Sequence, residues 1–165
     1  MERHFTVTGF LCDGDRTLLH WHKKLRMWLP PGGHIDANED PVQAVVREVL
    51  EETGIVAEVV PHAAPLPFAN VAQIATPLVI ICADVPDGPH QHIDMSYALR
   101  PVAGAPRQEP DADHGFVWVT EDQLRRDEPL GVASCGVDIK VEEDVRALGL
   151  RAIELVRDAN VEPRT

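Results

Sequence analysis

Hydrophobic and polar residues alternate along two segments near the start of the chain. HFTVTGFLC and TLLHWH both show this period of two, which is typical of β-strands with one buried face, and they flank the turn sequence DGDR. Because Asp-Gly favours a tight turn, residues 4–22 are predicted to form a β-hairpin. Shorter apolar or alternating runs predict further strands at 55–60, 76–85, 91–100 and 115–119.

Three other segments have helical patterns. Asp40 suits an N-cap and Gly54 suits a stop, so a helix is predicted over 41–53. Thr120 is placed to cap a short helix, TEDQLRR. A longer amphipathic helix is predicted over 138–158, where apolar residues recur on one side. These residues are Val141, Val145, Leu148, Ala152, Leu155 and Val156.

The remaining segments are predicted loops: a Pro/Gly/Asn-rich one at 22–40, a proline-rich one at 61–67 and a polar one at 101–113. Together the elements predict a mixed β-sheet with three helices, an α/β or α+β sandwich. A length of 165 residues suits one core, and no repeat or interdomain linker is visible. We therefore expect a single domain over 1–165.

The charge balance narrows the range of partners. The chain has 27 acidic residues against 15 Lys and Arg, a formal net charge of −12. Such a chain lacks the cations that neutralise a phosphate backbone, so no nucleic-acid partner is expected. A small phosphorylated ligand accompanied by a divalent cation remains compatible with this charge.

The same residues give expectations about the compartment. The longest apolar run, PLVIICA, is too short to span a membrane and resembles a buried strand. The first residues lead directly into a strand pattern, so no signal peptide is expected. Cys12, Cys82 and Cys135 are too few and too scattered for a disulfide framework, which favours reduced thiols and a cytoplasmic location.

An acidic cluster is the clearest candidate for chemistry. REVLEETG, residues 47–54, places three carboxylates on two helical turns. At about 100° per residue, Glu48, Glu51 and Glu52 share a narrow edge beside an apolar stripe. Like charges at this spacing destabilise a helix by roughly 0.2–0.5 kcal/mol per pair. Either this edge is simply solvated, or a bound cation offsets the repulsion.

The segment before the helix favours the cation. Gly32 and Gly33 can bring backbone atoms close to a ligand, because they have no side chains to obstruct it. Glu39 precedes the helix cap and can add a fourth carboxylate at the same edge. Carboxylate and carbonyl oxygens are the ligands that Mg²⁺ and Mn²⁺ prefer.

This pattern resembles the Nudix box. Gly33, five residues, Glu39, seven residues and then REVLEETGI fill every fixed position of that motif. The resemblance covers 23 residues directly and implies an α/β/α sandwich with a mixed β-sheet. It also implies hydrolysis of a nucleoside diphosphate linked to another moiety. Two neighbouring positions depart from the commonest sequence, since two prolines precede the glycines and Asn38 precedes Glu39.

The resemblance further implies roles for individual residues. Glu48, Glu51 and Glu52 would bind Mg²⁺ or Mn²⁺, with the Gly33 carbonyl as a further ligand. Arg47 and Glu39 would orient these glutamates. One glutamate, or a carboxylate outside the box, would activate the attacking water. Glu109, Asp111 and Asp113 lie in a late loop and are open alternatives for completing the metal site, against a merely solvated loop.

These observations predict a metal-dependent pyrophosphohydrolase. Its substrate would be a nucleoside triphosphate, or a nucleoside diphosphate derivative, attacked by water at phosphorus. The main alternative is a non-catalytic Nudix-fold nucleotide sensor, although the complete set of glutamates argues against it. An isomerase acting on a diphosphate ester is a third possibility. The resemblance also allows a homodimer.

Residues near the glycine turn are candidates for substrate binding. Lys23 and Arg26 belong to the most basic stretch of the chain and could contact phosphates, or could simply lie in a solvated loop. Trp28 could stack on a base or fill the core.

Polar residues also alternate with apolar ones along the strand predicted at 91–100, which gives it one polar face. These polar residues are His90, His92, Asp94 and Ser96. His92 and Asp94 could line the substrate cleft, or the face could simply be exposed. The pairs His20/His22 and His90/His92 have spacing compatible with zinc, but neither is accompanied by a Cys or a third His at ligand spacing, so zinc is not predicted.

Overall fold

The structure is a computed structural model that describes residues 1–85, 88–102 and 115–161. Its strands are β1 (Glu2–Asp13), β2 (Arg16–His22), β3 (Met27–Leu29), β4 (Gly32–His34), β5 (Ala57–Val59), β6 (Val79–Asp84), β7 (His90–Pro101), β8 (Phe116–Thr120), β9 (Leu130–Val132) and β10 (Val137–Ile139). Its helices are α1 (Pro41–Thr53), α2 (Glu121–Arg125) and α3 (Glu143–Val161).

The main sheet is mixed. Its central path runs β3-β2-β1-β7-β5, with β4 added to β1, β6 to β7 and β8 to β2. β1 and β7 are parallel and paired from Glu2 opposite His90 to Leu11 opposite Leu99, whereas the other pairs are antiparallel. The two long central strands therefore bring the start of the chain beside residues far along it.

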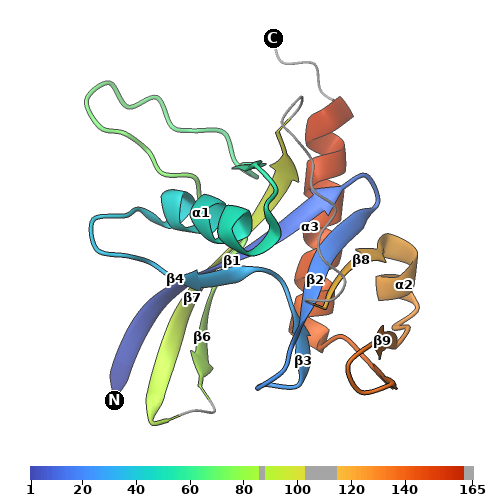
Figure 1. Ribbon diagram of the computed structural model, residues 1–165. Coiled ribbons are helices and arrows are strands. Elements are labelled where there is room, and N and C mark those ends of the chain that lie inside the picture. The colour runs from blue at the N-terminus through green and yellow to red at the C-terminus, as the bar shows by residue number, and fades with distance from the viewer. Residues whose placement is uncertain (86–87, 103–114, 162–165) are drawn as a thin grey trace.

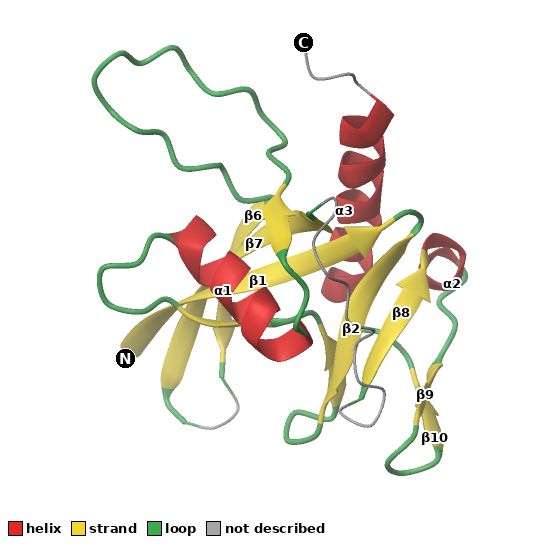
Figure 2. Ribbon diagram, turned by 45° about the horizontal axis from the view of Figure 1, so that its top comes forward, coloured by secondary structure: helices red, strands yellow, loops and turns green. Residues whose placement is uncertain are grey.

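Helices cover both faces of this sheet, and Figures 1 and 2 show α1 on one side and α3 on the other. Alternation along β1 divides the core accordingly, because successive side chains point to opposite faces. Val7 and Leu11 pack in the cluster that contains α1, while Phe10 packs in the cluster that contains α3. The predicted α/β/α sandwich with a mixed sheet is confirmed.

Helix α1 has the predicted bounds because both of its ends are determined locally. The Asp40 carboxylate accepts hydrogen bonds from the backbone N–H groups of Val42 (2.8 Å) and Gln43 (2.9 Å), and the Gln43 side chain accepts one from the Asp40 N–H (3.0 Å). Such a cap contributes about 1 kcal/mol. Gly54 ends the helix with φ 69°, a left-handed conformation that favours glycine.

The other helices differ in how well they match the sequence patterns. Thr120 caps α2 as predicted. The helix predicted over 138–158 is wrong at its start, because α3 begins at Glu143 and residues 137–139 form β10. Gly136 at φ 65° turns the chain back so that β10 pairs with β9. Val141 is buried as expected, but it lies before the helix.

The segment predicted as a loop at 22–40 contains two short strands, β3 and β4. Three residues are too few to show a period, and Gly32-Gly33-His34 has no strand propensity of its own. Pairing with β1 decides the structure instead. A Cβ atom on Gly32 would lie 2.3 Å from the carbonyl oxygen of Val7, so only glycine fits this close approach.

The predicted strands at 76–85, 91–100 and 115–119 correspond to β6, β7 and β8, and the one at 55–60 shortens to β5. The expectation that PLVIICA is a buried strand is wrong, because most residues of β6 are exposed. Most of the predicted loop at 101–113 lies outside the described residues. Among the helices that the structure describes, none has the length and apolar character needed to cross a membrane.

Candidate active site

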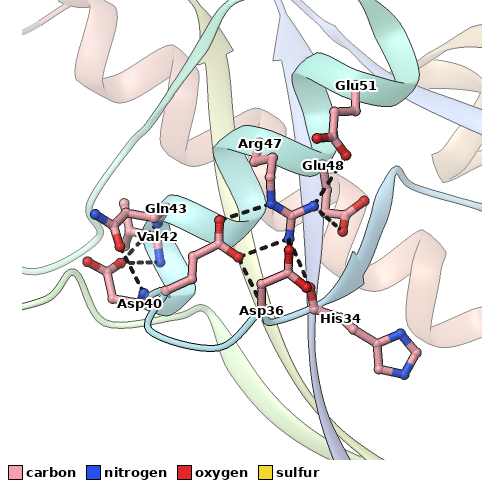
Figure 3. A network of polar contacts seen from close by, with 9 residues as sticks. His34, Asp36, Asp40, Val42, Gln43, Arg47, Glu48 and Glu51 are labelled. Atoms are coloured by element: carbon pink, nitrogen blue, oxygen red, sulfur yellow. Dashed lines mark hydrogen bonds and ion pairs between the residues drawn. The ribbon is translucent and has the colours of Figure 1, made fainter.

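Arg47 is the centre of the polar network beside α1 (Figure 3). Its Nε and Nη2 atoms donate hydrogen bonds to the two carboxylate oxygens of Glu39, each at 2.9 Å. This two-point arrangement fits the planar guanidinium and restrains both side chains. Glu39 therefore connects the loop before α1 to the middle of the helix.

The same guanidinium also contacts the acidic edge. Nη1 donates to Glu48 at 2.7 Å and to Glu51 at 3.3 Å, while Nη2 donates to the backbone carbonyl of His34 at 3.0 Å. One side chain thus contacts the loop, strand β4 and two carboxylates of the helix. Arg47 and Glu39 lie where the Nudix resemblance expects residues that orient glutamates.

Glycines of β4 allow the close approach of two glutamates. A Cβ atom added at Gly33 would lie 2.5 Å from a carboxylate oxygen of Glu48, so a side chain at this position would displace that carboxylate. The backbone N–H of Gly32 donates a hydrogen bond to Glu52 at 3.1 Å. The glycine pair therefore contacts the acidic edge directly.

The charges of this site are unevenly compensated. Hydrogen bonding to Arg47 lowers the pKa of Glu39 below its usual value. Desolvation of its carboxylate raises the pKa of Glu52, although the residue as a whole is exposed, and the negative charges of Glu48 and Glu51 raise it further. The hydrogen bond from the Gly32 N–H opposes these effects on Glu52.

This arrangement fits a hard divalent cation. Three carboxylates and the carbonyl of Gly33 supply oxygen ligands of the type that Mg²⁺ and Mn²⁺ require. A cation at this edge would offset the repulsion from Glu48 and Glu51, which adds to desolvation in raising the pKa of Glu52. Glu48, Glu51, Glu52 and Gly33 are therefore the residues that could hold such a metal.

The basic residues predicted to bind phosphate lie apart from this network. Lys23 and Arg26 are exposed in the turn between β2 and β3, and among the described residues no hydrogen bond or ion pair connects either of them with the box. Trp28 is 1% exposed and packs against Trp21 in the core. The prediction that Trp28 binds substrate by stacking on a base is therefore wrong. The alternative, that Trp28 fills the core, is the one observed.

The predicted polar face of β7 is present on the side of the sheet opposite α1. Asp94 accepts hydrogen bonds there from the hydroxyl groups of Thr6 and Thr8, each at 2.9 Å, and of Ser96 at 3.0 Å. His92 is partly buried on the same face. Glu109, Asp111 and Asp113 lie outside the described residues.

The sequence patterns did not identify two further residues of this polar face. His4 of β1 and His34 of β4 lie beside the predicted polar residues of β7, with the ring centroids of His34 and His92 5.1 Å apart. His4 did belong to an alternating strand, but nothing in the sequence indicated that this strand pairs with β7. Strand order and register supply that information.

Comparison with known proteins gives matches over most of the chain. The family model described as NUDIX domain matches residues 2–134. The chain is 43% identical over 44 residues to a putative 8-oxo-dGTP diphosphatase of Bacillus subtilis (strain 168), a match that covers 27% of this chain and 30% of that protein. It is 31% identical over 98 residues to an 8-oxo-dGTP diphosphatase of Proteus vulgaris, covering 56% and 71% respectively.

Solved structures agree on the fold. A NUDIX-family hydrolase from Clostridium perfringens is similar with a TM-score of 0.71 and 27% identity, over 94% of this chain and 99% of that one. A NUDIX hydrolase from Nitrosomonas europaea, at 17% identity and a TM-score of 0.57 over 99% and 98%, shares the fold. These relatives support hydrolysis of a pyrophosphate bond in a nucleotide and do not favour the sensor alternative. Because the NUDIX domain model spans most of its length, this chain belongs to the Nudix hydrolase family.

Proposed function

We propose that this chain is a Mg²⁺- or Mn²⁺-dependent pyrophosphohydrolase that cleaves nucleoside triphosphates by attack of water at phosphorus. The observation that carries the proposal is the Arg47 network, which joins Glu39, Glu48 and Glu51 around one guanidinium beside the glycines of β4. A merely solvated helix face needs no such bracing. The bracing is what a site requires if its carboxylates must hold a fixed geometry.

Each residue of the site has a role in this proposal. Glu48, Glu51 and Glu52, with the carbonyl of Gly33, would hold the metal. When bound, the metal polarises the phosphoryl group, lowers the pKa of water and offsets charge on the leaving phosphate. Arg47 positions two of the glutamates and neutralises part of their charge before metal and substrate arrive. Glu39 holds Arg47 and thus acts through it.

The substrate proposal starts from the relatives. Two of them are named as 8-oxo-dGTP diphosphatases, which makes 8-oxo-dGTP the first nucleotide to test, with nucleoside diphosphate derivatives as the second class. His92 and Asp94 stay proposed contacts for the nucleotide, and Lys23 and Arg26 stay proposed contacts for its phosphates. A homodimer also stays part of the proposal.

We further propose that the protein works in the cytoplasm, without a nucleic-acid partner. Cys12, Cys82 and Cys135 are all free in the structure, although Cys82 and Cys135 are exposed. Exposed unpaired thiols suit a reducing compartment. The net charge of −12 disfavours binding to a phosphate backbone.

A nucleotide panel in isotopically labelled water tests the reaction. The purified protein is incubated with 8-oxo-dGTP, dGTP, ADP-ribose and a UDP-sugar, each with Mg²⁺ or Mn²⁺, in water enriched in ¹⁸O. We expect a nucleoside monophosphate product, with ¹⁸O in one phosphorus-containing product, because water attacks phosphorus. Binding of nucleotide without turnover would support the sensor instead. A rearranged product without ¹⁸O would support the isomerase.

A further inference from the structure

A cluster of histidines lies on the sheet face opposite α1. His90 and His92 alternate along β7 and so share a face, and the parallel register places His4 of β1 directly opposite His92. One ring nitrogen from each of these three side chains lies within 4.8 Å of the others. Among the described residues, no other group of three His, Cys, Asp or Glu side chains meets this distance.

A second observation points to a missing partner in this cluster. The Nε2 atom of His92 is buried and has no hydrogen-bond partner. The ring of His4 lies tilted against those of His90 and His92, at centroid distances of 4.9 and 6.0 Å. These ring contacts do not provide a hydrogen-bond partner for Nε2 of His92. Buried nitrogen atoms normally find a partner, because an unpaired one has lost its water.

We propose that His4, His90 and His92 form a second metal site, separate from the acidic edge, that binds one Zn²⁺ ion through imidazole nitrogens. Zinc accepts three histidine ligands in a tetrahedral site. Zn–N bonds of about 2.0–2.1 Å place such ligand atoms roughly 3.4 Å apart, so small side-chain rotations would close the cluster.

The surroundings of the cluster also suit zinc. Glu2 lies 3.3 Å from Nε2 of His4, so a carboxylate is available to orient that ring and add negative charge. His34 flanks the cluster, with its ring centroid 5.4 Å from that of His4. The fourth ligand position can be filled by water.

The cluster and the acidic edge lie on opposite faces of the sheet. In β4, a side chain at Gly33 would meet Glu48 of α1, so the next side chain, that of His34, points to the other face. Figure 3 shows the His34 ring directed away from Arg47. The donors differ as well, because imidazole suits zinc whereas carboxylate suits magnesium.

Zinc titration in the presence of saturating Mg²⁺ tests the site. Mg²⁺ occupies oxygen ligands and leaves imidazoles free, so calorimetry should detect one Zn²⁺ equivalent in the wild-type protein. The H4Q/H90Q variant should weaken this binding at least about a hundredfold, since it removes two direct ligands. The matched control is H62Q, which changes an exposed histidine in a loop and should leave the affinity unchanged.

Further measurements keep the test decisive. Circular dichroism checks folding, and the H4Q variant alone serves if the double variant does not fold, because this side chain is 36% exposed. Co²⁺ substituted for zinc should give the absorption of a tetrahedral nitrogen site, lost in H4Q. The E52Q variant should keep the zinc site, which separates this proposal from the proposed function. Equal zinc affinity in wild type and H4Q/H90Q, or loss of the equivalent in E52Q, would overturn it.

Discussion

The acidic edge of α1 and the histidine cluster of β1 and β7 are assembled in opposite ways. The acidic edge and the residues that contact it come from one continuous segment, Gly32 to Glu52. Helix α1 and the neighbouring glycines of β4 determine their spacing. The histidine cluster combines residue 4 with residues 90 and 92, which meet only because β1 and β7 are parallel in one particular register. The first site depends on local geometry and the second on topology.

This difference extends to stability and chemistry. A one-residue slip between β1 and β7 would move His4 out of register with His92, whereas the spacing of the glutamates along α1 does not depend on that register. The acidic edge is braced by Arg47, whereas the buried Nε2 of His92 has no partner in the cluster. Oxygen ligands favour Mg²⁺ or Mn²⁺, and nitrogen ligands favour Zn²⁺. The two regions should therefore respond to different ions and to different substitutions.

The largest effect should come from the carboxylates of the acidic edge. Glu48→Gln and Glu52→Gln remove a negative charge but keep the shape of the side chain, so turnover of the best nucleotide substrate should fall at least about a thousandfold. Circular dichroism and the unfolding midpoint should change little. Glu154→Gln, on the exposed surface of α3, is the matched control and should retain wild-type turnover. Near-normal turnover in both box variants would contradict the proposed function.

The same contrast explains which parts of the structure the sequence predicted. The bounds of α1 followed from Asp40 and Gly54, since caps act on neighbouring backbone groups. The Arg47–Glu51 contact followed from helical spacing. The resemblance to a known motif implied that Glu39 orients the glutamates, but it did not predict the contact of Glu39 with Arg47. Each of these features depends on residues close together in the chain.

Other features depended on pairing between distant segments. β4 and β10 are strands because β1 and β9 lie beside them, and neither shows a period of its own. The burial of Trp28 follows from the packing of β2 against β3, which loop composition does not reveal. The contact of His4 with His92 requires strand order and register together. Local patterns cannot supply either.

A smaller loss of activity is expected from Arg47. Arg47→Lys keeps a positive charge but cannot contact Glu39, Glu48 and the His34 carbonyl at once. We expect roughly a 10–100-fold loss of turnover and a weaker apparent affinity for Mg²⁺, because residues that orient metal ligands act through ligand geometry. Arg100→Lys, which changes the Arg100–Glu58 pair between β5 and β7, is the control. Full activity of Arg47→Lys would show that charge alone suffices at this position.

Two glycines test whether the acidic edge can be disturbed without disturbing the core. Gly33→Ala places a methyl group 2.5 Å from the Glu48 carboxylate, which can rotate away. Activity should therefore fall about tenfold or more, with little change in stability.

Gly9→Ala places its methyl group 2.7 Å from Val49 and 3.0 Å from Val45, within the buried contact of β1 and α1. It should lower the free energy of unfolding by about 1–3 kcal/mol. Urea titration and steady-state kinetics on both variants measure the two effects, and equal behaviour of the variants would contradict the separation.

The smallest effect concerns His20, whose pair with His22 offers a contrast with the proposed zinc ligands. Burial, followed by the nearby His22, lowers the pKa of His20 to about 4, while a hydrogen bond involving the Pro30 backbone opposes the shift. The His20 ring takes up a proton near the ordinary histidine pKa of 6.5 in the unfolded chain, but only near pH 4 in the folded chain. The unfolded state thus binds more protons in this interval, so the contribution of His20 makes the free energy of unfolding fall as pH decreases from 6.5 to 4.

His20→Gln should reduce this fall in urea titrations, while His62→Gln should not, because residue 62 is exposed in a loop. An unchanged pH dependence in His20→Gln would mean that this ring is not held neutral by burial. Saturating Zn²⁺ should leave the His20 contribution unchanged if the metal binds only the cluster that contains His4.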